Sequence, residues 1–319
     1  MQYRKLGGSG LKVSAICLGT LPFGWWVKGP QSHAVLDAYH SAGGNFLDTA
    51  DVYPCPAEGV GGKLCEEIIG EWLHATGHRD SMVIATKVSG RMGPGPNDEG
   101  LSAKHIMRAV EGSLRRLRTD YIDLYQAHDD DPAVPMEEVL QAFDSLVRRG
   151  LVRYVGTSNF SAWRKMKALG ISRGSKLASY VSTQPLYNLV QRADFERELQ
   201  PLCVEEGIAV MPYSPLAEGF LTGRYQPDQP PPATARAGRV HQLYQGERVW
   251  RVLKATEHVA QQHGTAPAIV ALAWLLTRDA VVAPIVSANS PEQIQHTLQA
   301  LELKLSADEC AYLNNASEP

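Results

Sequence analysis

The sequence lacks the features that mark several large classes of protein. It has no apolar run near the roughly 18 residues that a membrane helix needs, and no basic stripe of the kind that binds nucleic acid. The net charge is −3, from 31 basic and 34 acidic residues interspersed along the chain. Near the N-terminus, Gly19 and Pro22 interrupt the apolar stretch that a signal peptide would keep intact. We therefore expect no membrane or nucleic-acid partner.

Cysteine usage argues against a disulfide framework. The five cysteines are odd in number and widely spaced, and the sequence has no Cys-x-x-Cys motif. This pattern fits a reduced, cytoplasmic setting, with Cys17 and Cys203 expected in the core. Cys55 lies two residues after Tyr53 and could be exposed near a site, although an ordinary loop cysteine is the simpler interpretation.

Strand-like and helix-like segments alternate along the whole chain of 319 residues. Short apolar strands between helices are typical of a parallel sheet that is buried on both faces. The strand candidates are Ser14–Leu18, Phe46–Asp48, Met82–Lys87, Ile122–His128, Val152–Ser158, Tyr180–Pro185, Ala209–Tyr213 and Ala283–Val286. The helical candidates are Ser32–Ala42, Lys63–Leu73, Ala103–Leu117, Met136–Arg149, Ser161–Leu169, Phe195–Glu206, Glu247–His263, Pro267–Thr277 and Pro291–Ala300.

Eight strands, each followed by a helix, predict an α/β fold of the closed (β/α)8 TIM barrel type, whose usual size is about 250 residues. We expect one domain over residues 1–319. A doubly wound open sheet is the alternative, and it is disfavoured because no Gly-x-Gly-x-x-Gly motif follows the first strand.

Three loops are too long to be simple connectors, and all of them follow strands. They therefore belong to the C-terminal face, where barrels of this type carry their active sites. We interpret them as the walls and lid of a substrate pocket. They are Pro54–Gly62, Gly90–Gly100 and Ala217–Gln245.

Four reactive side chains stand near the ends of consecutive strand candidates. Asp48 and Tyr53 follow the second strand, Lys87 ends the third, and His128 ends the fourth. The ordinary pKa of a tyrosine is about 10. We expect Tyr53 to donate a proton at neutral pH only if its surroundings lower this pKa. We predict that Tyr53 gives a proton to a carbonyl oxygen and that Lys87, held by Asp48, lowers the tyrosine's pKa. His128 would orient or polarise the carbonyl.

Each of these residues alone has an ordinary structural interpretation. An acid at a strand end can cap a helix or turn, a tyrosine in a loop can pack against its neighbours, and a lysine can form a salt bridge at the barrel rim. Their occurrence together on consecutive strand ends favours the catalytic interpretation. A metal site is not expected, because no cluster of histidine or cysteine with ligand spacing accompanies His128.

Several motifs carry a family resemblance over nearly the whole chain. They are Gly19-Thr20, Asp48-Thr49-Ala50-x-x-Tyr53, Thr86-Lys87, Asp120-Tyr121-Ile122-Asp123-Leu124-Tyr125-Gln126-x-His128, Gly150-x-Val152-Arg153-Tyr154-Val155-Gly156-x-Ser158-Asn159-Phe160, Gln184-x-x-Tyr187-Asn188 and Tyr213-Ser214-Pro215-Leu216. With them the chain resembles the aldo-keto reductase superfamily, and more its bacterial and potassium-channel-β-like branches than the aldose reductase branch. The resemblance implies the barrel, the four catalytic roles above, and a nicotinamide cofactor bound without a Rossmann domain.

The resemblance also implies which residues hold the cofactor. Ser158, Asn159 and Gln184 would bind the nicotinamide carboxamide, and Tyr213 would stack on the ring. The pyrophosphate would lie along Ser214, Pro215, Leu216, Gly219, Leu221 and Arg224. Gly19, Thr20 and Asp48 would also contact the cofactor, and its adenosine end would lie against Ser287, Ala288, Asn289, Gln293 and Thr297.

At the adenosine end the sequence departs from the aldose reductase branch. There a lysine and an arginine clamp the 2′-phosphate of NADP, where this chain has Ser287 and Gln293, and a Glu-Asn pair is replaced by His296-Thr297. The loss of charge-assisted hydrogen bonds costs a phosphate roughly 1.5–3 kcal/mol each. Neutral groups such as Asn289 and the amides that open the last helix could still hold it. We therefore expect NADP(H) to be slightly favoured, with NAD(H) also used.

The substrate pocket is expected at Trp25, Trp26, Tyr53, His128, Asp129 and Phe160. Asp129 would either reject anionic substrates or cap a turn. The leading function is NAD(P)H-dependent reduction of a small aldehyde or ketone to an alcohol. Oxidation of a sugar or alcohol with NAD is one alternative, and a subunit that keeps the cofactor as a redox sensor is another. The sequence leaves the natural substrate and the oligomeric state open.

Overall fold

The computed structural model describes residues 1–54, 62–227, 229–230, 232 and 237–318. Cys55 lies outside the described residues, as do parts of the predicted loops Pro54–Gly62 and Ala217–Gln245, so these expectations are untested. Within the described part of the chain, no helix is both long and apolar enough to cross a membrane.

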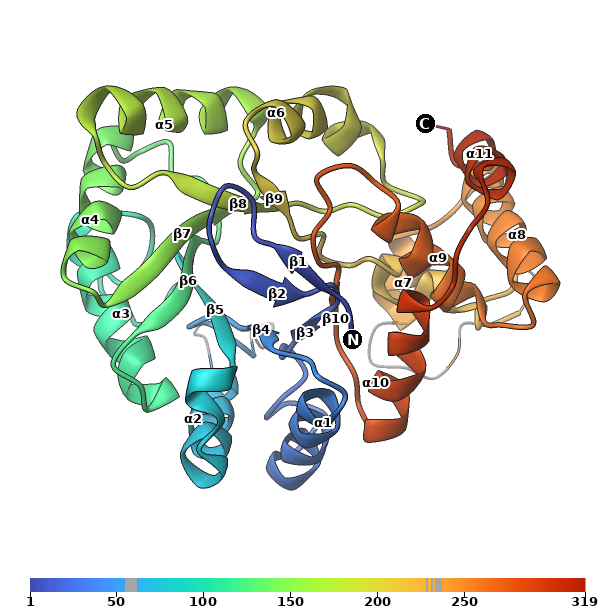
Figure 1. The fold of residues 1–319 in the computed structure, drawn as a ribbon, viewed down its shortest axis with the longest axis horizontal. Helices are drawn as coiled ribbons and strands as arrows, with labels where there is room; N and C mark the ends of the chain where they lie inside the picture. The colour runs from blue at the N-terminus through green and yellow to red at the C-terminus, as the bar shows by residue number, and fades with distance from the viewer. Residues whose placement is uncertain (55–61, 228, 231, 233–236, 319) are drawn as a thin grey trace.

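Eight parallel strands of the described chain form one sheet that closes into a barrel (Figure 1). The strands follow chain order, and the last, β10, pairs with β3. The remaining gap is closed by hydrogen bonds from Val282 N to Val210 O (2.8 Å) and from Ile285 N to Pro212 O (2.9 Å). The predicted (β/α)8 barrel is thus confirmed. Its strands are β3 (Cys17–Gly19), β4 (Phe46–Asp48), β5 (Val83–Val88), β6 (Ile122–Ala127), β7 (Val152–Ser158), β8 (Tyr180–Gln184), β9 (Ala209–Val210) and β10 (Ile285–Val286).

The helices surround the sheet because each has an apolar side to bury against it. In α3 (Ala103–Leu117), for example, Ile106, Val110 and Leu117 are fully buried in the core between sheet and helices. Each predicted helical segment overlaps one of the observed helices. The others are α1 (Gly29–Ser41), α2 (Leu64–Thr76), α4 (Met136–Arg148), α5 (Ala162–Ser175), α6 (Gln200–Glu205) with the preceding π-turn η2 (Phe195–Leu199), α8 (Glu247–Gln262), α9 (Pro267–Leu276) and α10 (Pro291–Leu298).

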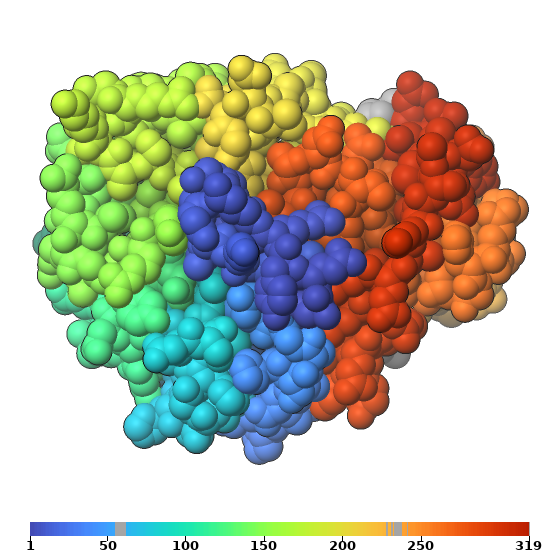
Figure 2. All heavy atoms as spheres, viewed as in Figure 1, coloured from blue at the N-terminus to red at the C-terminus, as the bar shows by residue number. Residues whose placement is uncertain are grey.

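An N-terminal hairpin that was not predicted from the sequence closes one end of the barrel. Its strands β1 (Tyr3–Lys5) and β2 (Lys12–Ser14) are antiparallel, and Figure 2 shows the hairpin over the middle of that face. Leu6 and Val13 are fully buried in the apolar cluster inside the barrel. The turn requires Gly7, since its φ is +55° and a Cβ there would lie 2.5 Å from a carbonyl oxygen of β8. Only the opposite end, at the carboxyl ends of the strands, is left for a site.

Two further helices were also not predicted. The helix α7 (Ala237–Leu243) lies within the predicted lid loop, and α11 (Ala307–Ala316) packs beside α8 (Figure 1). Cys17 and Cys203 are both fully buried, which confirms their predicted place in the core. The short turns are η1 (His78–Ser81), η3 (Ala217–Thr222) and η4 (Gln299–Leu301).

Candidate active site

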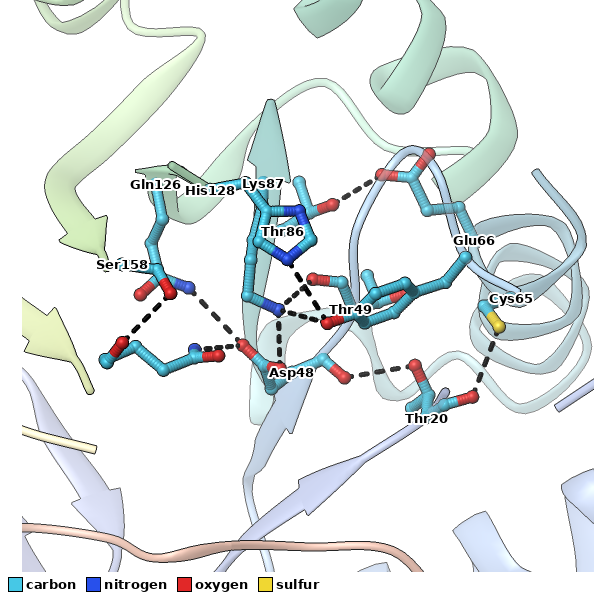
Figure 3. Close-up of polar contacts among 12 residues, drawn as sticks. Thr20, Asp48, Thr49, Cys65, Glu66, Thr86, Lys87, Gln126, His128 and Ser158 are labelled. Carbon is cyan, nitrogen blue, oxygen red and sulfur yellow. Dashed lines mark hydrogen bonds and ion pairs between the residues drawn. The ribbon is translucent and has the colours of Figure 1, made fainter. Parts of the chain in front are cut away.

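Lys87 lies fully buried at the carboxyl end of β5. Its Nζ donates to Asp48 Oδ2 at 2.7 Å and to the Thr49 carbonyl oxygen at 2.9 Å, and it reaches Tyr53 Oη at 3.4 Å (Figure 3). Burial alone would lower the pKa of Lys87, but Asp48 and Tyr53 outweigh it, and the pKa lies above its ordinary value. The lysine therefore stays charged next to the phenol.

Tyr53 Oη also lies 3.5 Å from Nε2 of His128, and the two rings meet edge to face. Burial raises the pKa of Tyr53, while Lys87 acts in the opposite direction. The net shift is upward, not downward as predicted, because the effect of burial is larger than that of the Lys87 charge. Burial, with Lys87, lowers the pKa of His128 to about 3, so the imidazole is neutral near pH 7.

Two glutamines hold the second carboxylate oxygen of Asp48. Gln184 Nε2 donates to Asp48 Oδ1 at 2.9 Å and Gln126 Nε2 at 3.3 Å. Ser158 Oγ in turn donates to the Gln184 carbonyl oxygen at 2.9 Å. Gln126 was not among the site residues predicted from the sequence. Gln126 lies two residues after Leu124, so both side chains lie on the inward side of β6. A polar residue at an inward position, where apolar residues are usual, is the signal that could have identified it.

A second set of buried polar groups lies behind the barrel wall at Thr86. Glu66 accepts hydrogen bonds from Thr86 Oγ1 (2.6 Å) and Arg116 Nε (2.7 Å), so its charge is paired. Asp51 is fully buried, and within the described residues neither of its carboxyl oxygens has a hydrogen-bond partner. Burial, with Glu66, raises the pKa of Asp51 well above its ordinary value. The structure thus gives Asp51 a buried place in which its charged form is disfavoured.

Asn159 and Tyr213 meet at the rim of the barrel, where the nicotinamide is predicted. Tyr213 Oη donates to Asn159 Oδ1 at 3.1 Å, and Asn159 has a left-handed backbone with φ of 57°. Across the rim, Thr20 Oγ1 donates to the Asp48 carbonyl oxygen at 3.0 Å. At Gly19 a Cβ would lie 2.7 Å from Ile285, so the wall at the end of β3 needs a glycine.

The segment predicted to hold the pyrophosphate forms a tight turn after β9. Ser214, Glu218 and Gly219 have positive φ, and Asn188 Nδ2 fixes the turn by donating to the Ser214 carbonyl oxygen at 3.0 Å. Space is open beside Gly219, where a Cβ would meet no atom within 4 Å. Of the other predicted contacts in this turn, Leu221 is fully buried and Arg224 is exposed.

The segment predicted for the adenosine end is held by hydrogen bonds among its own residues. Asn289 N donates to Gln293 Oε1 at 2.8 Å, and Thr297 Oγ1 donates to the Gln293 carbonyl oxygen at 2.9 Å. Trp26 Nε1 donates to Asn289 Oδ1 at 3.0 Å and so ties the loop after β3 to this segment. From Ser287 to Thr297 the chain contains no lysine or arginine.

The two tryptophans of the predicted substrate pocket pack against each other. The ring centroids of Trp25 and Trp26 are 4.7 Å apart, and Trp25 is 43% exposed, so an aromatic surface is open to solvent there. Phe160 differs, because it is only 3% exposed and packs edge-on against Tyr180. Its predicted contact with a substrate would need the surroundings to move.

The family model of the aldo/keto reductase family matches residues 15–318 of this chain. The chain belongs to the aldo/keto reductase family. It is 36% identical to the uncharacterized oxidoreductase YrpG of Bacillus subtilis, over 99% of this chain and 95% of YrpG. It is 34% identical to an aryl-alcohol dehydrogenase (NADP(+)) of Phanerodontia chrysosporium (98% and 85%) and 37% identical to a putative voltage-gated potassium channel subunit beta of Schizosaccharomyces pombe (94% and 88%).

The residues predicted to surround the nicotinamide are compatible with the cofactor that the family implies. Two buried polar atoms next to Asp48, Gln126 Oε1 and Thr49 Oγ1, have no hydrogen-bond partner within the described residues. Such orphaned groups are unusual in the absence of a ligand or water. The segment predicted for the adenosine end, from Ser287 to Thr297, has no lysine or arginine to pair with a 2′-phosphate. The described residues contain no cluster of acids, histidines and cysteines that could hold a metal ion.

Proposed function

We propose that this aldo/keto reductase reduces aldehydes or ketones to alcohols with NADPH or NADH, and that Tyr53 is the proton donor. One observation supports this proposal most strongly: the hydroxyl of Tyr53 lies within 3.5 Å of both Lys87 Nζ and His128 Nε2. The pKa of Tyr53 lies above its ordinary value, but Lys87 lowers it relative to burial alone. An alkoxide forming on the substrate is a much stronger base than a phenolate, so Tyr53 can still protonate it.

The four residues divide the reaction between them. When bound, the reduced nicotinamide supplies the hydride to the carbonyl carbon. Tyr53 gives its proton to the carbonyl oxygen, and Lys87 stabilises the resulting phenolate until water returns the proton. Asp48 holds Lys87 in place, and neutral His128 can donate one N–H to the carbonyl oxygen.

Oxidation of an alcohol, the reverse reaction, is a second candidate function, because the same residues can catalyse both directions. The relative named as an aryl-alcohol dehydrogenase supports an alcohol substrate with an aromatic group, as does the exposed Trp25. The relative named as a potassium channel subunit supports a cofactor-binding sensor instead. The complete set of Asp48, Tyr53, Lys87 and His128 favours turnover over a sensor without chemistry.

The cofactor preference is proposed to be relaxed, with NADP(H) slightly favoured. The absence of a cation between Ser287 and Thr297 argues for acceptance of NADH, and the relative that acts with NADP(+) argues for NADPH. The ratio of kcat/KM for the two cofactors tests this. A preference for NADPH beyond roughly a thousandfold, about 4 kcal/mol, would contradict it.

Tyr53→Phe tests the catalytic proposal on an aromatic aldehyde. Loss of a general acid is expected to lower kcat by roughly 10²–10⁴-fold, with the dissociation constant of the cofactor little changed. Tyr312→Phe is the control, because that tyrosine is 46% exposed on α11. An unchanged rate in Tyr53→Phe would show that the assignment is wrong. Tight cofactor binding without turnover of any carbonyl by the native protein would favour the sensor.

A further inference from the structure

Two neighbouring acids follow β6 and face different parts of the molecule. Asp130 turns to α5, where both of its oxygens accept hydrogen bonds from Arg164, from Nε at 2.7 Å and from Nη2 at 2.6 Å. Asp129 turns to the rim, where its Oδ1 accepts from Asn159 Nδ2 at 2.8 Å. Asp130 thus has a charged partner, whereas the partner of Asp129 is a neutral amide.

The contact with Asp129 determines how the Asn159 amide is oriented. Asn159 Nδ2 also donates to the His128 carbonyl oxygen at 3.2 Å, so both of its N–H groups are used. A carboxylate and a carbonyl can only accept hydrogen bonds. The Asn159 amide must therefore point its nitrogen to Asp129 and its oxygen to Tyr213, whose hydroxyl donates to that oxygen at 3.1 Å.

Asp129 also places a negative charge beside this part of the site. It raises the pKa of Tyr213, although burial is the larger cause. Asn159 and Asp129 are both exposed at the rim, so a ligand at Tyr213 would approach them directly. An oxidised nicotinamide ring carries a positive charge and a reduced one does not. A carboxylate nearby therefore favours the oxidised form.

We infer that Asp129 is a positioning residue for the nicotinamide end of the cofactor. It fixes the Asn159 amide and, through it, the Tyr213 ring, and its charge strengthens binding of the oxidised cofactor relative to the reduced one. This inference rests on the proposed function, since it needs a nicotinamide at Tyr213. It concerns cofactor binding and makes no use of the proton transfer by Tyr53.

The test compares Asp129→Asn with Asp130→Asn in the full-length protein. The dissociation constants of NADP+ and NADPH are measured by fluorescence titration, and unfolding by urea is followed in parallel. Asp129→Asn is expected to raise the dissociation constant of NADP+ roughly threefold to tenfold, to raise that of NADPH less, and to leave the unfolding midpoint near that of the native protein. Asp130→Asn, which breaks a two-bond ion pair, is expected to lower the midpoint and to leave both constants unchanged.

Equal effects of the two variants on cofactor binding would overturn the inference, as would an Asp129→Asn protein whose ratio of the two constants equals the native one. Failure of the inference can be told apart from failure of the proposed function. If Tyr53→Phe is inactive and Asp129→Asn binds both cofactors normally, only the inference is wrong. If Tyr53→Phe is active and the Asp129→Asn ratio shifts, only the proton donor is wrong. A native protein that binds no nicotinamide cofactor would contradict both.

Discussion

The ammonium group of Lys87 and the carboxylate of Asp48 lie 2.7 Å apart, with no more than 4% of either side chain exposed. A charge in such a place is stable only while its partner is present, because removal from water costs several kcal/mol. The ion pair therefore has two effects. It holds Lys87 beside Tyr53 for the proposed reaction, and it offsets the cost of burying the lysine's charge.

Removal of either charge alone should destabilise the protein more than removal of both. We expect Asp48→Asn and Lys87→Met each to lower the free energy of unfolding by about 3–5 kcal/mol. The double variant should lose less than the sum, and a double-mutant cycle from urea unfolding measures the difference. Glu71→Gln is the control, because its 3.6 Å ion pair with Arg118 is half exposed and should contribute about 0–1 kcal/mol. Additive losses in the cycle would count against the coupling.

The lowered pKa of His128 predicts a loss of stability in acid. In the unfolded chain a histidine takes up a proton below its ordinary pKa of 6.5, whereas folded His128 does so only near 3. Between these values the unfolded state binds the extra proton, so stability falls as the pH falls, by at most about 1.4 kcal/mol per pH unit. His128→Asn should remove this part of the dependence, measured by urea unfolding from pH 7 to pH 4. His74→Asn, on the exposed side of α2, should keep it.

Strand-end chemistry explains why the four central residues could be predicted. In a barrel, residues at the carboxyl ends of the strands lie close together, whatever the conformation of the loops. Here the contacts join Lys87, Asp48, Tyr53 and His128. The shift in the pKa of Tyr53 could not be predicted, because it depends on how much protein surrounds the ring. The raised pKa of Asp51 likewise follows from the burial that tertiary packing imposes.

The parts of the fold that were missed need the barrel in place before they are stable. The hairpin strands Tyr3–Lys5 and Lys12–Ser14 are too short and polar to be recognised locally, and their apolar neighbours are buried only in the barrel mouth. Similarly, α7 forms within a loop rich in proline, and Val240 and Tyr244 are buried there against η3. In both segments tertiary contacts outweigh local sequence preference.

A cation at the adenosine end should change the cofactor preference. Gln293 lies on the first turn of α10, where it bonds to Asn289. Gln293→Arg should lower the dissociation constant of NADPH roughly tenfold to a hundredfold and change that of NADH little, because a charge-assisted bond to phosphate contributes about 1.5–3 kcal/mol. Gln295→Arg adds the same charge two residues along the helix and is the control. Similar gains in both variants would indicate general electrostatic attraction instead of a phosphate contact.

A second buried lysine, Lys165 on α5, lies against the outside of the barrel, and its hydrogen-bond partners among the described residues are neutral. Its Nζ donates to Thr157 Oγ1 at 2.5 Å and to the Ser182 carbonyl oxygen at 2.7 Å. Burial lowers the pKa of Lys165 to about 7. Thr157 directly precedes Ser158, so this lysine stands behind the wall that carries the predicted carboxamide contact.

Replacement of Lys165 by methionine should therefore change how stability depends on pH. The unfolded lysine keeps its proton up to its ordinary pKa of 10.5, whereas the folded one releases it above about 7. Stability of the native protein should thus rise between pH 7 and pH 10, by up to about 1.4 kcal/mol per pH unit, and the cost of the buried charge should be greatest below pH 7. Lys165→Met should lack this rise, and Lys167→Met, on the exposed side of the same helix, should keep it. Urea unfolding across this range measures both, and parallel curves for Lys165→Met and the native protein would mean that folded Lys165 keeps its proton up to pH 10.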